Sequence, residues 1–203
     1  LISGTGQDIS ILTLVQMGAM YAPMVQGPAD LYRFVAPMFL HMDLMHLLFN
    51  MVALYSVGEL LERVLGRGNF LLLYFVAGIT GNVVSYAVDM AQGGGLSVSA
   101  GASTSVFGLF VAVALLCVLV RGNRAVFRDF SKSMLSIIAV NVIYTLLVPN
   151  ISISGHLGGA IGGAIAMLLL PAASLRTPRP VRIVVAVLWV VAVAAVLVWG
   201  GVF

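Results

Sequence analysis

Charged residues are scarce in this sequence. Asp, Glu, Lys and Arg make up 8% of its 203 residues, whereas a soluble domain carries about 25%. Hydrophobic residues make up 61%, and the mean hydropathy is +1.12. This composition excludes an ordinary soluble fold, and continuous apolar runs without alternation argue against membrane-spanning strands. The sequence therefore predicts an all-α, polytopic transmembrane helix bundle.

Cysteine and basic patches are also lacking. Cys117 is the only cysteine, so neither a disulfide nor a cysteine metal site can form within one chain. The net charge of +3 comes from basic residues between apolar runs, without the aromatic-interleaved patch typical of nucleic-acid binding. The expected surroundings are a lipid bilayer, and nucleic acid is not an expected partner.

Apolar runs of about 20 residues, the length of a membrane-spanning helix, account for most of the chain. Residues 1–38 precede them and are predicted to be a partly helical segment at the membrane interface, with an ordinary extramembrane loop as the alternative. Pro149 ends the fourth run, and three further prolines punctuate the last connection. The six predicted spans are residues 40–61, 70–90, 102–120, 134–148, 156–170 and 183–203.

Positive charge is concentrated in alternate connections. Nine of the ten Lys and Arg residues follow the first, third or fifth span, and Arg33 is the exception. Cytoplasmic loops hold the excess of Lys and Arg, so these three connections are predicted to be inside. Spans one, three and five then enter from the outer face, and their N-terminal portions are expected to lie at similar depth. Those portions carry His46, Asn50, Ser103 and His156.

These polar residues suggest acyl transfer. A serine hydroxyl is a poor nucleophile until a base removes its proton, and histidine is the usual base at neutral pH. We therefore pair Ser103 with His156, and expect the ring of Phe107, one helical turn after Ser103, to stack on the imidazole. His46 and Asn50 share one helix face and are expected to donate to the developing oxyanion, together with the Ser103 N–H.

Each of these features has a simpler interpretation. A membrane serine usually bonds back to its own helix, and a His-xxx-Asn pair more often makes an interhelical hydrogen bond. Asp43 is expected to cap a helix, Glu59 and Glu62 to pair with Arg63 or Arg67, and His41 to lie at the interface. Small residues, including Gly101 on the third span, favour close helix packing. On the fifth span, glycines recur every four residues at 155, 159 and 163, and again at 158 and 162.

The chain resembles the rhomboid intramembrane serine proteases over nearly its whole length. The residues that carry the resemblance are His41-Met-Asp-Leu-Met-His46-Leu-Leu-Phe-Asn50, Gly101-Ala-Ser103 and Gly155-His156-Leu-Gly-Gly, supported by Tyr32-Arg33 and Glu62. The resemblance implies Ser103 as nucleophile, His156 as general base, and His46 and Asn50 as oxyanion stabilisers. Arg33 and Glu62 look like an arginine and a glutamate that the family carries, and together with Phe107, Gly101 and Gly159 they are predicted to be supporting residues. The resemblance also implies single-span membrane proteins as substrates and no metal or other cofactor.

The resemblance also sets expectations for organisation. The family's first core helix is expected to be missing here, and the sixth span to be an addition at the C-terminus. Residues 1–38 would be an extracytoplasmic segment, 39–175 the catalytic core, and 176–203 a linker with the added helix. The expected location is a bacterial plasma membrane, with the active site on the extracytoplasmic side. The alternative function is an inactive, membrane-helix-binding chaperone or quality-control protein.

Overall fold

The computed structural model describes residues 9–95, 97–121, 127–129, 132, 135–136, 139, 143 and 152–203. Within these ranges the chain is helical, and its only β-structure is two isolated bridges, Met20 with Ser99 and Val120 with Leu175. The all-α prediction is therefore confirmed for this part of the chain. The fourth predicted span, 134–148, lies largely outside the described residues. Those described within it, at 135–136, 139 and 143, are helical.

Five long helices of the bundle lie within the described ranges. They are α2 (Leu44–Leu65), α3 (Arg67–Ala91), α4 (Ser103–Leu119), α6 (Ile153–Leu169) and α7 (Arg179–Trp199). By length and composition, α2, α3 and α7 can cross a membrane, while α4 and α6 are shorter apolar helices of 17 residues each. At 1.5 Å per residue such a helix is about 25 Å long, somewhat less than the hydrocarbon core.

Local capping explains why the helix boundaries differ from the predicted spans. The helix α2 begins at Leu44 and not at residue 40, because the Asp43 carboxylate accepts a hydrogen bond from the His46 N–H at 2.7 Å. Ser152 caps α6 in the same way, so this helix starts before His156. The helix α7 begins at Arg179 and not at residue 183, and Pro180 fits its first turn because the missing N–H would have no partner there.

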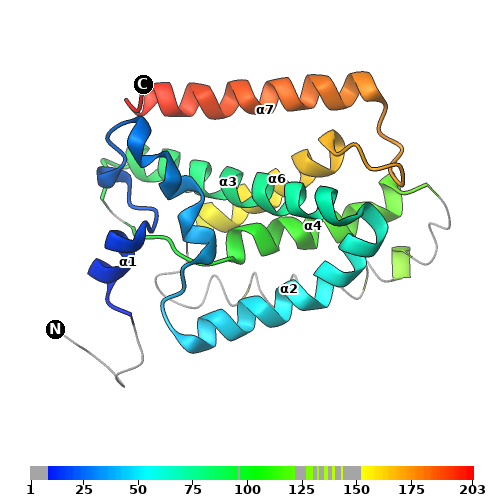
Figure 1. Ribbon diagram of the computed structural model, residues 1–203, viewed down its shortest axis with the longest axis horizontal. Coiled ribbons are helices and arrows are strands. Elements are labelled where there is room, and N and C mark those ends of the chain that lie inside the picture. The colour runs from blue at the N-terminus through cyan, green and yellow to red at the C-terminus, as the bar shows by residue number, and fades with distance from the viewer. Residues whose placement is uncertain are drawn as a thin grey trace.

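The N-terminal segment is partly helical, as predicted. It contains α1 (Ile11–Met17) and three short 3-10 helices, η1 (Ala22–Met24), η2 (Pro28–Phe34) and η3 (Ala36–Phe39). Its side chains join those of α3 and α7 in a small apolar cluster that includes Met20, Phe34, Tyr86, Leu197 and Val202. This segment lies at the end of the bundle where α4 and α6 begin (Figure 1).

In the bundle, α3, α4 and α6 pack against one another, with α7 and α2 on opposite sides (Figure 1). Two hydrogen bonds connect α7 and its C-terminal end to α3. The Trp189 indole donates to the Thr80 hydroxyl at 2.9 Å, and the Tyr86 hydroxyl donates to the Gly200 carbonyl at 3.0 Å. Most of α2 and α7 faces outward and is apolar, as expected of surfaces in contact with lipid.

Candidate active site

Ser103 is the first residue of α4, and the chain before it is held by backbone hydrogen bonds. Met20 and Ser99 exchange both of their N–H···O bonds at 2.9 Å, and the Gly101 N–H donates to the Pro37 carbonyl at 2.8 Å. Gly101 has a φ of 140°, a conformation that favours glycine. The Gly-rich link thus approaches the start of α4 along a defined path.

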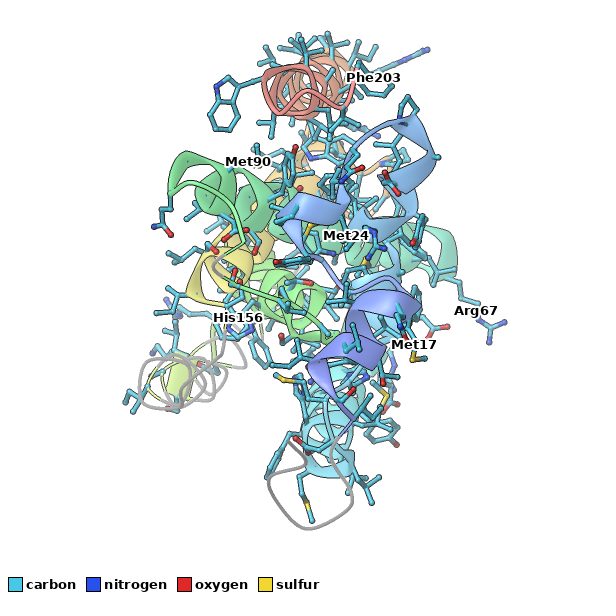
Figure 2. The ribbon with its side chains drawn as sticks, turned by 90° about the vertical axis from the view of Figure 1, so that its left-hand side faces the viewer. Met17, Met24, Arg67, Met90, His156 and Phe203 are labelled. Atoms are coloured by element: carbon cyan, nitrogen blue, oxygen red, sulfur yellow. The ribbon has the colours of Figure 1, made fainter. Side chains whose placement is uncertain are left out.

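His156 lies in the first turn of α6 (Figure 2) and faces Ser103. Its Nε2 atom is 2.7 Å from the Ser103 Oγ, within hydrogen-bond distance, and the residue is only 7% exposed. The ring of Phe107 stacks on the imidazole, with centroids 4.2 Å apart and an interplanar angle of 8°. The structure thus contains the Ser–His pair and the aromatic stack that the sequence predicted.

Glycines allow this approach of α6 to α4. A β-carbon on Gly159 would overlap the carbonyl oxygen of Thr104, and one on Gly163 would overlap the backbone of Gly108. The second glycine series faces a different helix, because Gly158 and Gly162 lie against α3 near Gly81, Val84, Thr80 and Ala77. One small-residue helix therefore packs closely on two neighbours, and backbone contact on the α4 side brings His156 to Ser103.

His46 approaches the same place from α2. A β-carbon at Gly101 would lie 2.8 Å from the His46 Nε2 and 3.4 Å from the Ser103 Oγ. Because glycine has no β-carbon, a small space lies between the imidazole and the hydroxyl. The other ring nitrogen, Nδ1, is buried and has no hydrogen-bond partner in the part of the chain that the structure describes. The His46 ring also makes an edge contact with the ring of His41, at 5.2 Å between centroids.

Asn50 lies one turn after His46 on the same helix and is buried. Its side-chain amide donates to the His46 carbonyl at 2.9 Å, so the bond that it makes lies within α2 and not between helices. An amide nitrogen carries two hydrogens, and this bond uses one of them.

Arg33 and Glu62, predicted as supporting residues, do not contact the Ser–His pair. Arg33 is buried and donates through Nη1 to the carbonyls of Val15 and Ala19, at 2.8 and 3.1 Å, so it holds the end of α1. Glu62 lies near the opposite end of the bundle and pairs with Arg67 at 2.9 Å. Glu59 pairs with Arg63 there, which confirms the simpler interpretation of both glutamates.

Sequence reasoning missed two residues near the site. The predicted interfacial residue His41 accepts a long hydrogen bond, 3.4 Å, from the Ala102 N–H through Nε2. Asp89 is 5% exposed, and its carboxylate accepts from the Gly95 N–H at 3.0 Å in the Gly-rich link. The available signal was a lone acid near the C-terminal end of an apolar helix, three residues before the run Gln92-Gly-Gly-Gly95.

Comparison with known proteins gives a consistent set of relatives. A family model described as "Rhomboid domain" matches residues 28–173. Rhomboid protease GluP of Bacillus subtilis (strain 168) is 38% identical over 175 residues, which cover 85% of this chain and 33% of the relative. Rhomboid-like protease 3 of Toxoplasma gondii is 34% identical over 153 residues, covering 74% of this chain and 56% of the relative.

A plant relative, RHOMBOID-like protein 1 of Arabidopsis thaliana, is 32% identical over 156 residues, covering 76% of this chain and 38% of the relative. The chain therefore spans between 33% and 56% of the length of these three curated relatives. The matched region includes every residue of the Ser–His site and the helices that position it.

Proposed function

Because the chain belongs to the rhomboid family, we propose that it is an intramembrane serine endopeptidase in which Ser103 is the nucleophile and His156 is the general base. The observation that carries this proposal is the 2.7 Å hydrogen bond between the Ser103 Oγ and the His156 Nε2. A base within this distance of a hydroxyl can remove its proton as the hydroxyl attacks a carbonyl carbon. Stacking on Phe107 holds the imidazole plane during this transfer.

Each proton in the reaction has a donor and an acceptor. His156 Nε2 accepts the Ser103 proton, and Oγ forms a bond to the substrate carbonyl carbon. The resulting tetrahedral intermediate collapses when the imidazolium donates that proton to the leaving amine, and the peptide bond breaks. A water molecule then attacks the ester and gives a proton to His156. His156 passes this proton to the Ser103 Oγ as the ester bond breaks, and the carboxylic acid product leaves.

The oxyanion would lie in the space beside Gly101. The Ser103 N–H is in the first turn of α4, where backbone N–H groups have no partner within the helix, and His46 Nε2 borders the same space. Asn50 retains one amide hydrogen that is not used by the His46 carbonyl. We assign these three donors to the oxyanion and to the substrate carbonyl.

The charge distribution supports an orientation for the site. The described cations that follow α2, α4 and α6 lie at the end of the bundle opposite Ser103, and such positive ends face the cytoplasm. In a bacterial plasma membrane, the Ser–His pair would then open toward the extracytoplasmic side. The substrates would be single-span membrane proteins, cut near the outer end of their helix.

We also propose a division of the chain. Residues 39–175 form the catalytic core, in which α2, α3, α4 and α6 correspond to the second, third, fourth and sixth family helices. Residues 1–38 form an extracytoplasmic segment, and 176–203 contain the linker and an additional helix, α7. The bonds from α7 to α3 through Trp189 and Tyr86 support its place as an integral part of the bundle.

The test is cleavage of a labelled single-span protein by the purified chain in liposomes, with the product's new N-terminus sequenced. Ser103→Ala and His156→Ala should each reduce cleavage to background. Ser105→Ala is the matched control, since it removes a buried hydroxyl two residues away that lies beside Tyr74 and Gly78 of α3, and it should retain activity within about threefold. Equal activity in all three variants would contradict the assignment. Substrate binding without any product from the wild-type chain would favour the chaperone function instead.

A further inference from the structure

Arginine side chains join the end of α4 to the connection between α6 and α7. Arg121 donates through Nε to the Leu175 carbonyl at 2.9 Å, and Arg176 donates through Nε to the Val120 carbonyl at 3.0 Å. These bonds reinforce the β-bridge between Val120 and Leu175, which joins the end of α4 to this connection. Both side chains are exposed.

A third arginine repeats the arrangement at the start of α7. Arg182 donates through Nε to the Thr177 carbonyl at 3.0 Å. Within the described ranges, the Nη atoms of Arg121, Arg176 and Arg182 have no hydrogen-bond partner. As far as the described residues go, each guanidinium is held by one nitrogen, and the two others can bind an external group.

These arginines also differ from the other basic residues at the same end of the bundle. Arg63 and Arg67 pair with Glu59 and Glu62 on the α2–α3 side. Among the residues that the structure describes, no carboxylate lies within 4.0 Å of the three arginines at the α4–α7 side. Among the described side chains at this end, the arginines on the α2–α3 side are paired with glutamates, and Arg121, Arg176 and Arg182 are not.

The uncompensated charges adjoin an exposed apolar surface. The apolar helix α7 is almost entirely exposed, and Val184, Leu188 and Val191 are 55%, 62% and 57% exposed. Arg182 lies at the beginning of this helix, where the apolar surface starts. Figure 1 shows α7 along one side of the molecule, with the connection from α6 at its arginine-bearing end.

We propose that this region is a binding site for an anionic phospholipid, a property separate from the proteolytic activity. The phosphate would accept hydrogen bonds from the Nη atoms of Arg121, Arg176 and Arg182, since a guanidinium presents two parallel donors that match phosphate oxygens. The acyl chains would lie along α7. An anionic lipid is favoured over a zwitterionic one because the three arginines form no ion pair with a described carboxylate, so their positive charge attracts a net negative headgroup.

The experiment is native mass spectrometry of the purified full chain with equal amounts of phosphatidylglycerol and phosphatidylcholine. The wild-type protein should retain phosphatidylglycerol preferentially, and R121Q/R176Q should retain at least fivefold less of it. The control is R63Q/R67Q, which removes the same charge from the same end but affects only arginines already paired with glutamate. It should retain phosphatidylglycerol within twofold of the wild type.

Three outcomes would overturn the proposal: unchanged retention in R121Q/R176Q, an equal loss in both double variants, or equal retention of the two lipids by the wild type. Because the Nε bonds also hold the connection, R121Q/R176Q could fail to fold. A second measurement therefore uses the wild-type chain and phosphatidylglycerol with a photoreactive acyl chain. Crosslinks should concentrate on α7, and equal labelling of the exposed helix α2 would contradict the site.

Discussion

Gly159 on α6 contacts the backbone of Thr104 on α4 so closely that no β-carbon fits between them. Thr104 directly follows Ser103, and Gly159 lies three residues after His156. The contact therefore occurs within one helical turn of both members of the Ser–His pair. It accounts physically for a hydrogen bond between residues that are separated by 53 positions in the chain.

The first prediction concerns this contact. Gly159→Ala should separate α6 from α4 and destabilise the protein by roughly 1–3 kcal/mol, the usual cost of overpacking. It should also slow labelling of Ser103 by a fluorophosphonate probe, because His156 would move away from the hydroxyl. The measurements are the unfolding midpoint and the labelling rate.

Gly68→Ala is the matched control for that substitution. Gly68 lies in α3, and a β-carbon there meets nothing within 4 Å. Alanine is favoured over glycine in a helix by about 1 kcal/mol, so this variant should be as stable as the wild type or more stable, with normal labelling. A Gly159→Ala protein that behaves like Gly68→Ala would show that the α4–α6 contact is not required for the Ser–His geometry.

The second prediction concerns the ring stacked on His156. Phe107→Leu keeps an apolar side chain but removes the flat surface 4.2 Å from the imidazole centroid. Misorientation of a base costs catalysis steeply, so we expect kcat to fall roughly 10- to 100-fold. Phe110→Leu removes an aromatic ring one turn further along α4. The centroid of this ring lies 6.0 Å from that of Phe107. The substitution should reduce stability by a similar amount while changing kcat much less. Equal effects of the two variants on kcat would indicate a packing role only.

Much of the site could be predicted because its determinants are local or topological. Asp43 is followed by an apolar helical run, and a side-chain oxygen at that position is a general way to satisfy the first N–H groups of a helix. Ser103 and His156 both lie in the first turn of helices that the charge pattern predicts to run inward. Their common depth follows from the count of helices between them and needs no knowledge of packing.

Other features depend on the path of the chain in space. The glycine spacing on α6 predicts close packing, but it does not indicate that one series faces α4 and the other faces α3. The contact of His41 with the Ala102 N–H could not be predicted, because it depends on the path of the Gly-rich link in space. The bond from the Asn50 amide to the His46 carbonyl is likewise a choice between available acceptors that spacing alone does not decide.

The third prediction concerns Asp89 as a positioning residue for the Gly-rich link. Gly93, Gly94 and Gly95 all have positive φ values, and the Asp89 carboxylate accepts from the Gly95 N–H. Asp89→Ala should lose a buried charge-assisted bond, destabilise the protein by about 1–3 kcal/mol and reduce cleavage of a membrane-protein substrate about tenfold. Asp89→Asn keeps an acceptor oxygen and should restore most of the activity.

Labelling by a fluorophosphonate separates two explanations of that loss. The half of the link nearest Ser103 is also held by the Ser99–Met20 pair and the Gly101–Pro37 bond, so labelling of Ser103 should change less than about threefold in Asp89→Ala. Loss of labelling in parallel with substrate cleavage would mean that Asp89 supports the whole site. Full substrate cleavage by Asp89→Ala would show that Asp89 does not position the link for catalysis.

The last prediction concerns His41 and pH. Burial, and secondarily the nearby His46, hold the pKa of His41 below its ordinary value of 6.5, although the Phe39 carbonyl and the Asp43 carboxylate oppose this shift. The neutral ring can accept the Ala102 N–H at Nε2, and the protonated ring cannot. A lowered pKa in the folded state means that the unfolded chain takes up the proton first as the pH falls.

The contribution of His41 to stability should therefore be complete above pH 6.5 and decline as the pH falls toward the lowered pKa of the folded protein. His41→Phe keeps a ring of similar size without titration, so the difference in unfolding midpoint between wild type and variant isolates this one group. We expect the difference to be largest near pH 7.5 and to shrink toward pH 5. A difference that instead grows below pH 6.5 would show that Asp43 stabilises a protonated His41 more strongly than burial opposes it, and would contradict the role of Nε2 as an acceptor.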